Sequence, residues 1–361
     1  MPKLLIITGE PSGDLHGANL IRELKEHIPN LKVFGIGGEK LKEEGVELIF
    51  HIKDIGIIGI FEIIPKLILI RKAMRIVYKK LIEETPDLCL LIDYPGFNLR
   101  VARLAKRRGV KVVYYILPQI WAWGRWRLSS IYKYVDTGIS ILPFEHKFYK
   151  KTKIKFVGHP LLDVTKSSQA SQSKNIVALL PGSRAEEIKR ILPVMLNCVK
   201  LLPNLEFILP VAQGVNKSWV EGIVEKAGLN PKVKVEDNNV HWVLKQSEIA
   251  IVASGTATLE ACLFEVPMVI IYKVAPLSYV LGRLLVRSRW IGLPNLIAGK
   301  YIVPEFIQFN AKPEKIVRAV QQILKNREKM LSNIRGIKNK LGTPGAVQRA
   351  AQIICDVLNE A

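Results

Sequence analysis

Cysteine is scarce in this sequence, and its few copies form no pattern. Four cysteines stand singly inside apolar segments, without a CxxC pair or a Cys/His spacing typical of metal ligands. Single cysteines of this kind are typical of reduced core residues in a cytosolic protein. We therefore expect no disulfide, no metal site and no cofactor. The residues concerned are Cys89, Cys198, Cys262 and Cys355.

Other absences exclude further classes of protein. No loop has the GxGxxG pattern with a following acidic residue, which disfavours a dehydrogenase, and no GxxxxGK[ST] loop occurs. The chain has no repeat of solenoid period and no low-complexity tract. Its first residues lack the charged, apolar and cleavage regions of a signal peptide, so we expect them to form a strand.

Acidic residues are outnumbered by basic ones. The 361 residues include 53 Lys and Arg against 32 Asp and Glu, which gives a net charge of +21. Each basic cluster alone is typical of a solvated face, but the total favours an anionic partner: a phosphorylated substrate, an anionic membrane surface or nucleic acid. We disfavour nucleic acid because the sequence has no nucleic-acid motif and no aromatic-lined basic stripe.

Apolar runs of strand length alternate with segments of helical periodicity, which predicts parallel sheets covered on both faces. The chain is long enough for two such domains, and the polar segment 161–174 is the expected linker. We predict an α/β fold of two Rossmann-like, doubly wound domains with a cleft between them. The domains span residues 1–165 and 166–342, and the helices after residue 313 break at Gly336 and at 342–345. The expected strands are 3–8, 32–36, 87–92, 111–115, 175–180, 207–211, 249–253 and 268–272.

Two loops of the second domain have the composition of a nucleotide-diphosphate site. In open parallel sheets, ligands bind beyond the carboxyl ends of the strands. Loop 181–184 opens a helix, where N–H groups and an arginine attract an anion, and loop 254–260 adds hydroxyls and a carboxylate able to accept ribose hydroxyls. The predicted UDP-binding residues here are Gly182, Ser183, Arg184, Ser254, Gly255, Thr256 and Glu260.

Two loops of the first domain contain acidic residues, and those of loop 9–14 would repel a bound phosphate. Asp93 ends the strand 87–92 and is a candidate general base, because a sugar hydroxyl that attacks an anomeric carbon must lose its proton. A structural role as a helix cap is the alternative. In loop 9–14 we expect Ser12, Gly13 and Asp14 to face a sugar or acceptor, although a capped strand–helix turn explains the loop equally well.

Six motifs in this order resemble the lipid-A-disaccharide synthase family. They are GEPSGD at 9–14, IDYPGFN at 92–98, QIWAW at 119–123, LPGSR at 180–184, SGTATLE at 254–260 and LPNLIA at 293–298. The resemblance covers the whole chain and implies the GT-B fold, with the terminal helix 343–361 crossing back to the first domain. It also places Asn295 on the UDP side and Gln119, Trp121 and Trp123 toward the acceptor, although packing of the tryptophans is an alternative.

The resemblance implies an inverting, metal-independent transfer in lipid A biosynthesis. UDP-2,3-diacylglucosamine would donate its sugar to 2,3-diacylglucosamine 1-phosphate, and a β-1,6-linked disaccharide and UDP would result. Asp93 matches the family's proposed base. Similar proteins form homodimers by exchange of C-terminal elements. The rival readings are another enzyme of this fold that uses UDP-N-acetylglucosamine, either a muramyl-peptide transferase or a 2-epimerase, and a basic nucleic-acid-binding protein.

The most apolar segment, 55–70, is shorter than the roughly 20 apolar residues that span a bilayer. Basic residues follow it directly, and this pairing suits a helix that docks at an anionic lipid surface, although a buried helix is the alternative. We therefore expect a cytoplasmic protein, peripheral on the inner face of the inner membrane. The predicted docking residues are Phe61, Ile64, Leu67 and Ile68.

Overall fold

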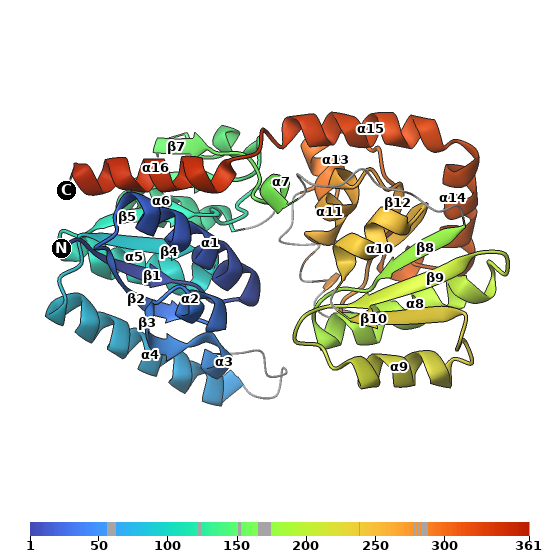
Figure 1. Ribbon diagram of the computed structural model, residues 1–361, viewed down its shortest axis with the longest axis horizontal. Coiled ribbons are helices and arrows are strands. Elements are labelled where there is room, and N and C mark those ends of the chain that lie inside the picture. The colour runs from blue at the N-terminus through green and yellow to red at the C-terminus, as the bar shows by residue number, and fades with distance from the viewer. Residues whose placement is uncertain are drawn as a thin grey trace. The chain divides into compact units, whose positions relative to one another are not determined.

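Two parallel β-sheets, each with helices on its faces, organise the chain in a computed structural model (Figure 1). The first unit comprises Met1–Asp163 with Gly342–Ala361, and the second comprises Val164–Leu341. The structure describes the chain except residues 56–62, 122–123, 151–152, 165–174, 238, 277–278, 281, 283–287 and 361. In addition, the side chains of residues 54–55, 63–67 and 164 are not described.

The first unit has a seven-stranded sheet in the order β3-β2-β1-β4-β5-β6-β7. Every strand pair is parallel. β1 and β4 form the centre, and their Leu and Ile side chains are fully buried, as expected for strands covered on both faces. The strands are β1 (Lys3–Ile7), β2 (Lys32–Gly37), β3 (Glu47–His51), β4 (Leu88–Ile92), β5 (Lys111–Tyr115), β6 (Thr137–Ser140) and β7 (Lys153–Phe156).

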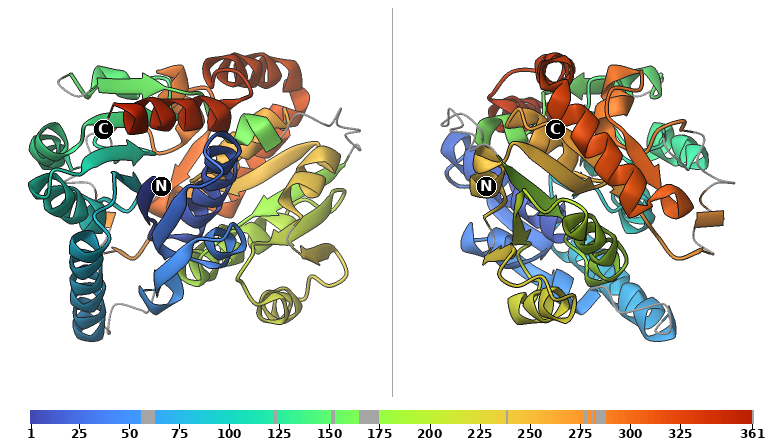
Figure 2. Two further views of the ribbon diagram at one scale, coloured as in Figure 1. Left: turned by 60° about the vertical axis from the view of Figure 1, so that its left-hand side comes forward. Right: turned by 90° about the vertical axis from the view of Figure 1, so that its right-hand side faces the viewer.

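Helices cover this first sheet in two groups. α4, α5 and α6 pack against one another over the core that contains Leu5, Leu91 and Tyr114. α1 packs against α2 and against the last helix, α16, which returns from the end of the chain (Figures 1 and 2). The helices are α1 (Pro11–His27), α2 (Glu39–Glu43), α3 (Ile52–Ile55), α4 (Ile63–Glu83), α5 (Pro95–Arg107), η2 (Arg125–Arg127), α6 (Leu128–Tyr134), η3 (Glu145–Lys147), α7 (Leu161–Val164, which crosses the unit boundary) and α16 (Ala346–Asn359).

The second unit has a six-stranded parallel sheet in the order β10-β9-β8-β11-β12-β13. α8 packs with α14, and α11 packs with α13 and α15. Its strands are β8 (Ile176–Leu180), β9 (Glu206–Val211), β10 (Val233–Asp237), β11 (Ile249–Ala253), β12 (Met268–Tyr272) and β13 (Glu305–Ile307). Its helices are α8 (Ala185–Lys200), α9 (Lys217–Lys226), α10 (Val240–Gln246), α11 (Ala257–Leu263), α13 (Leu293–Ala298), η4 (Gln308–Asn310), α14 (Pro313–Lys325) and α15 (Arg327–Lys340).

The predicted pair of doubly wound parallel sheets is confirmed. One local prediction is wrong: α15 runs through Gly336 without a break. A single glycine inside a helix costs only about 1 kcal/mol relative to alanine, and buried side chains such as Ile334 and Ile337 anchor the helix on either side. The helices break at Asn326 and, as predicted, at Gly342–Gly345, where both glycines have positive φ, +97° and +93°.

Candidate functional site

The loop between β8 and α8 places Ser183 and Arg184 at the surface. Gly182 has a φ of +114°, and a Cβ added there would lie 2.1 Å from Oε2 of Glu187. The Glu187 carboxyl therefore lies close to the Gly182 backbone, so part of the anion site predicted here is occupied by the protein itself. Burial raises the pKa of Glu187, and the nearby Arg184 opposes that rise. What the loop offers a ligand is therefore mainly the side chains of Ser183 and Arg184.

The loop between β11 and α11 is open at its centre. Gly255 and Thr256 are exposed, and no heavy atom lies within 4 Å of a Cβ added at Gly255. The residues around them are held in place: the Ser254 hydroxyl donates to Ile291 O at 3.2 Å, and the buried Thr258 hydroxyl donates to Gly255 O at 2.7 Å. A fixed loop with an accessible backbone suits close approach by a ligand.

Glu260 of α11 has a partner that the sequence reasoning missed. Nε2 of His241, on α10, lies 3.2 Å from Glu260 Oε1, and the two side chains are 35% and 20% exposed. The imidazole also lies 5.1 Å from the ring of Phe264. A partly exposed carboxylate oriented by a histidine can still accept hydrogen bonds from a ligand. Nothing in the sequence pairs these residues, because they belong to different helices.

Asn295, predicted to lie on the UDP side, is fully buried. Its amide oxygen accepts from the N–H groups of Ile302 and Val303 at 2.7 and 2.9 Å, and its amide nitrogen donates to Val303 O and to Glu305 at 2.8 and 2.7 Å. Glu305 in turn accepts from the N–H groups of Ile291 and Gly292, both at 3.0 Å. Because Ile291 O accepts the hydrogen bond from the Ser254 hydroxyl, Asn295 supports the loop 254–260 through this network.

Asp93 stands at the end of β4 in an uncommon backbone conformation. Asp93 and Tyr94 both have positive φ, +46° and +45°, and such residues cost of order 1–3 kcal/mol each. The Asn98 amide donates to Asp93 O at 2.7 Å and to Ile92 O at 3.1 Å, and the Tyr114 hydroxyl donates to Asp93 O at 2.5 Å. The half-buried Asp93 side chain is thus set on a strained, fully braced backbone, a feature that clusters at active sites.

The neighbouring loop 9–14 is filled by the protein's own groups. The Tyr94 ring lies against Gly9, where an added Cβ would be 2.2 Å from it. Asp14, predicted to face the acceptor, is 4% exposed and accepts from the N–H groups of Gly38, Lys40 and Leu41 at 2.6, 3.0 and 3.3 Å. Asp14 is therefore a structural residue that caps α2. Ser12 is exposed and Gly13 is buried.

The segment after β5 contains two residues that were predicted to face the acceptor substrate, one exposed and one buried. Gln119 is exposed, whereas Trp121 is only 8% exposed and packs edge-on against Phe144, with ring centroids 5.1 Å apart. The Trp121 indole donates to Glu145 Oε1 at 3.4 Å. These contacts agree with the packing alternative for Trp121. Trp123 lies outside the described residues.

Glu145 is a second carboxyl of the first unit that the sequence reasoning missed. It is 2% exposed, and burial raises its pKa to about 8, with the charge of Asp93 adding to the rise. Its carboxylate accepts from Trp121 and, at 3.4 Å, from the N–H of Leu142. The negative charge of Asp93 thus favours the protonated form of Glu145.

The predicted membrane helix is only partly described. Phe61 lies outside the described residues, and the side chains of Ile64 and Leu67 are not described although both belong to α4. Ile68 is 60% exposed, and the exposed Arg71 and Lys72 follow it. Among the helices of the described chain, none has the length and apolar character needed to cross a bilayer. The described part of the chain also contains no cluster of three His, Cys, Asp or Glu residues placed to hold a metal ion.

The family model and the curated relatives that match this chain agree with one another. A family model described as Lipid-A-disaccharide synthetase matches residues 4–353. Lipid-A-disaccharide synthase of Syntrophus aciditrophicus is 39% identical over 99% of this chain and 98% of its own length. The enzyme of the same name from Coxiella burnetii is 39% identical over 98% of both chains, and that of Geobacter sulfurreducens is 38% identical over 99% and 98%.

Solved structures of low sequence identity share the fold. The glycotransferase of kitacinnamycin superposes with a TM-score of 0.67 at 15% identity, covering 99% of both chains. UDP-GlcNAc 2-epimerase of Methanocaldococcus jannaschii, solved with UDP-GlcNAc and UDP, superposes with a TM-score of 0.63 at 16% identity over 98% and 99%. The two-sheet architecture is therefore that of GT-B glycosyltransferases and related epimerases.

Proposed function

The chain belongs to the lipid-A-disaccharide synthase family, and we propose that its two units divide the reaction between them. It is a glycosyltransferase of lipid A biosynthesis that uses a nucleotide-sugar donor and a lipid-linked acceptor. The second unit holds the UDP part of the donor, and the first unit supplies the base that activates the acceptor. Neither a muramyl-peptide transferase or 2-epimerase nor a nucleic-acid-binding protein is favoured beside this family membership.

The donor is UDP-2,3-diacylglucosamine and the acceptor is 2,3-diacylglucosamine 1-phosphate. The 6-hydroxyl of the acceptor attacks the anomeric carbon of the donor while the bond from that carbon to the UDP oxygen breaks. The hydroxyl proton passes to a carboxylate, and UDP leaves with the bonding electron pair. The product is a β-1,6-linked disaccharide 1-phosphate with inverted configuration at the anomeric carbon.

One observation carries the assignment of the base: the strained and braced position of Asp93. A backbone with positive φ at two successive residues persists only where surrounding contacts impose it, and here Asn98 and Tyr114 impose it. Such bracing holds a catalytic carboxylate in place for proton transfer. The buried Glu145 adds a neighbouring charge when it ionises, and its raised pKa keeps it largely protonated at neutral pH.

The second unit supports UDP binding through its exposed strand-end groups. Arg184 and Ser183 project from the loop after β8, and Gly255 and Thr256 leave the loop after β11 open. Arginine hydrogen bonds would neutralise the charge that grows on the departing diphosphate. Glu260, oriented by His241, would accept the ribose hydroxyls. Asn295 and Glu305 act by holding the supporting segment, without touching the nucleotide.

The acylated substrates call for a lipid-facing surface, and α4 provides it at the inner face of the inner membrane. Its described outer side combines the exposed Ile68, Tyr78 and Ile82 with exposed Arg71 and Lys72. An apolar stripe beside a basic collar is suited to an anionic bilayer surface.

Liposome flotation tests this docking surface. Replacing Phe61, Ile64, Leu67 and Ile68 together by Ser should release the protein from vesicles that contain anionic lipid. Leu201→Ser, in the second unit and 45% exposed, is the matched control and should float like the unaltered chain. Unchanged flotation of the fourfold variant would remove the membrane role of this segment.

A homodimer by C-terminal exchange is part of the same proposal. α16 is joined to the preceding helix through Gly342–Gly345, two glycines of positive φ that suit a hinge. In the single chain, the Arg349 guanidinium fixes this segment by donating to Val157 O and Thr343 O. Light scattering on the purified protein tests the dimer. C-terminal exchange requires a particle with twice the mass of one chain. A monomer at all concentrations would exclude the exchanged dimer.

The function itself is tested by release of UDP. With UDP-2,3-diacylglucosamine as donor, release should depend on 2,3-diacylglucosamine 1-phosphate and should be far slower with unacylated glucosamine 1-phosphate. Equal release with both acceptors would contradict the acceptor assignment, and release without any acceptor would point to hydrolysis.

A further inference from the structure

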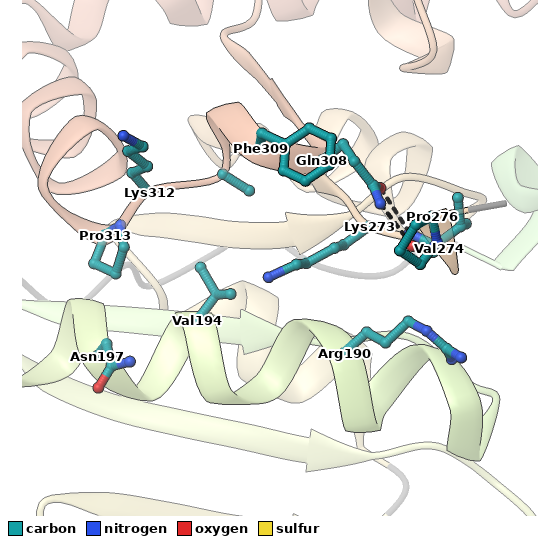
Figure 3. A pocket seen from close by; sticks show the side chains of 11 residues that line it. Arg190, Val194, Asn197, Lys273, Val274, Pro276, Gln308, Phe309, Lys312 and Pro313 are labelled. Carbon is teal, nitrogen blue, oxygen red and sulfur yellow. Dashed lines mark hydrogen bonds between the residues drawn. The ribbon is translucent and has the colours of Figure 1, made fainter. Parts of the chain in front are cut away.

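A cavity of about 560 Å³ lies in the second unit between α8 and the segments that follow β12 and β13 (Figure 3). Its volume falls within the roughly 300–1,000 Å³ typical of small-molecule sites. Val194 of α8 forms part of its floor, and Val274, Pro276, Phe309 and Ala311 contribute apolar surface opposite. Phe309 is 74% exposed, although a large aromatic side chain at the surface is costly to leave in water.

The polar groups of the cavity divide into used and available ones. The Gln308 amide is used, because it donates to Val274 O at 2.8 Å and accepts from Val274 N at 3.1 Å. Arg190 is paired with Glu186 at 2.8 Å. Within the part of the chain that the structure describes, the Lys273 and Lys312 side chains have no hydrogen bond or ion pair. Figure 3 shows the Lys273 side chain extending into the open space above Val194.

The cavity adjoins the proposed diphosphate site. Lys273 comes directly after β12, which pairs with β11, and the N–H of Ser254 at the end of β11 donates to Ile271 O at 2.9 Å. Arg190 and Val194 lie on α8, the helix that the loop of Ser183 and Arg184 opens. The two loops and the cavity thus share α8 and the ends of the neighbouring strands β11 and β12, an arrangement that suits a ligand extending from the loops into the cavity.

We propose that this cavity binds a fatty acyl chain of the nucleotide-sugar donor, with Lys273 at its mouth holding an oxygen of the donor. The inference rests on the proposed function, which supplies an acylated donor. The apolar walls formed by Val194, Val274, Pro276, Phe309 and Ala311 suit a hydrocarbon chain, and a nucleoside or a free sugar would place hydrogen-bonding groups against them. The Lys273 ammonium beside these walls can donate hydrogen bonds to oxygens at one end of an amphiphile, while the hydrocarbon end packs against the walls.

Two variants of the full-length protein test the cavity. Val194→Phe fills the space over α8, and Lys273→Met removes the ammonium while it keeps the stem. The matched controls are Leu201→Phe, at an exposed position after the same helix, and Lys300→Met, at an exposed position outside the cavity. Dissociation constants are measured by calorimetry for UDP, UDP-N-acetylglucosamine and UDP-2,3-diacylglucosamine.

Val194→Phe should weaken binding of the diacylated donor by about tenfold or more, because burial of several methylenes is lost, while UDP binding stays within about twofold. Lys273→Met should weaken the diacylated donor by several-fold more than it weakens UDP, and both controls should match the unaltered protein. Equal constants for the diacylated donor in Val194→Phe and the unaltered protein, or an equal loss for UDP in both cavity variants, overturn the proposal.

The outcome is separable from that of the proposed function. If the unaltered protein releases UDP with the diacylated acceptor but the cavity variants bind the donor normally, the enzyme assignment stands and the acyl site is elsewhere. If acyl-dependent binding is lost in the cavity variants but the unaltered protein never releases UDP, the cavity assignment stands and the reaction is wrong.

Discussion

The first strand–helix loops of the two units occupy the same place in their sheets but are built in opposite ways. In the first unit, the Tyr94 ring covers Gly9 and the Asp14 carboxylate turns inward to cap α2. In the second unit, the glycine position is backed by Glu187, and Arg184 is left at the surface. A similar fold thus gives one loop whose acidic side chain turns inward and one loop that leaves an arginine at the surface. Only the second is suited to a diphosphate, which leaves the first unit to supply the base.

The largest expected effect comes from the first unit. Asp93→Asn keeps the size and backbone of the residue but cannot accept the acceptor proton, so kcat should fall by about 10²–10⁴-fold, the range of general-base catalysis. Steady-state UDP release with diacylated substrates measures it. Asp136→Asn, at an aspartate that pairs with Lys106, is the control and should stay within about threefold. Near-normal turnover in Asp93→Asn would show that Asp93 is not the general base and that its role is structural.

Asn295, which supports the loop 254–260, should contribute mainly to the free energy of unfolding. Asn295→Ala leaves the backbone groups of Ile302 and Val303 without partners, and each buried group in that state costs about 1–3 kcal/mol. The free energy of unfolding should therefore fall by about 3 kcal/mol or more in urea denaturation. Asn197→Ala, at an exposed position, should change it by less than about 0.5 kcal/mol. A loss of UDP affinity in Asn295→Ala at unchanged stability would contradict the supporting role.

Substitution of Gly182 tests whether the shape of its loop matters for UDP binding. Gly182→Ala forces a Cβ against Glu187 at a φ of +114°, so the loop must shift and UDP binding should weaken by about tenfold, consistent with about 1–3 kcal/mol of strain. Gly228→Ala has a φ of +70° but no atom within 4 Å of the new Cβ, and it should lower stability without changing UDP affinity. Calorimetric titration with UDP distinguishes the two, and equal affinities would show that the loop shape is unimportant for UDP.

The smallest effect concerns Glu145 and pH. Burial raises its pKa to about 8, whereas an unfolded glutamate has a pKa of about 4.3. Between these values the folded protein holds a proton that the unfolded chain lacks, so this stabilisation is complete below about pH 4.3 and is lost as the pH rises to about 8. The loss has an upper limit of about 1.4 kcal/mol per pH unit.

Glu145→Gln removes this dependence. Its unfolding free energy should fall less than that of the unaltered protein between pH 5.5 and pH 8.5, since glutamine does not ionise. Glu43→Gln, at a side chain that is 59% exposed, should keep the unaltered slope. Parallel curves for Glu145→Gln and the unaltered protein would show that Glu145 ionises normally.

The central strands were predictable from sequence, whereas several outer ones were not. Segments such as 249–253 are uniformly apolar and fully buried, so composition alone reveals them. β3, β7 and β10 are all edge strands, and their residues are mostly half-buried or exposed. Such strands mix polar and apolar side chains and resemble loops. The sheet they join, more than their own sequence, makes them strands.

From the sequence, the candidate site was predictable only where a polar or charged residue follows a buried strand. Asp93 and Arg184 follow buried strands, and the carboxyl ends of strands are where ligands bind. The burial of Asp14, Trp121 and Asn295 depends on partners supplied by folding, such as the backbone of 38–41 for Asp14. For the same reason Glu145 escaped notice, since its carboxyl meets Trp121 only in the folded chain.

Calorimetric titration of UDP into Arg184→Met and Asp93→Asn tests the division of labour most directly. Loss of the arginine's charged hydrogen bonds, worth about 1.5–3 kcal/mol, should weaken UDP binding by about 10–150-fold in Arg184→Met. Asp93→Asn should bind UDP within about twofold of the unaltered protein although its turnover is lost. Weakened UDP binding in Asp93→Asn together with normal binding in Arg184→Met would contradict the account.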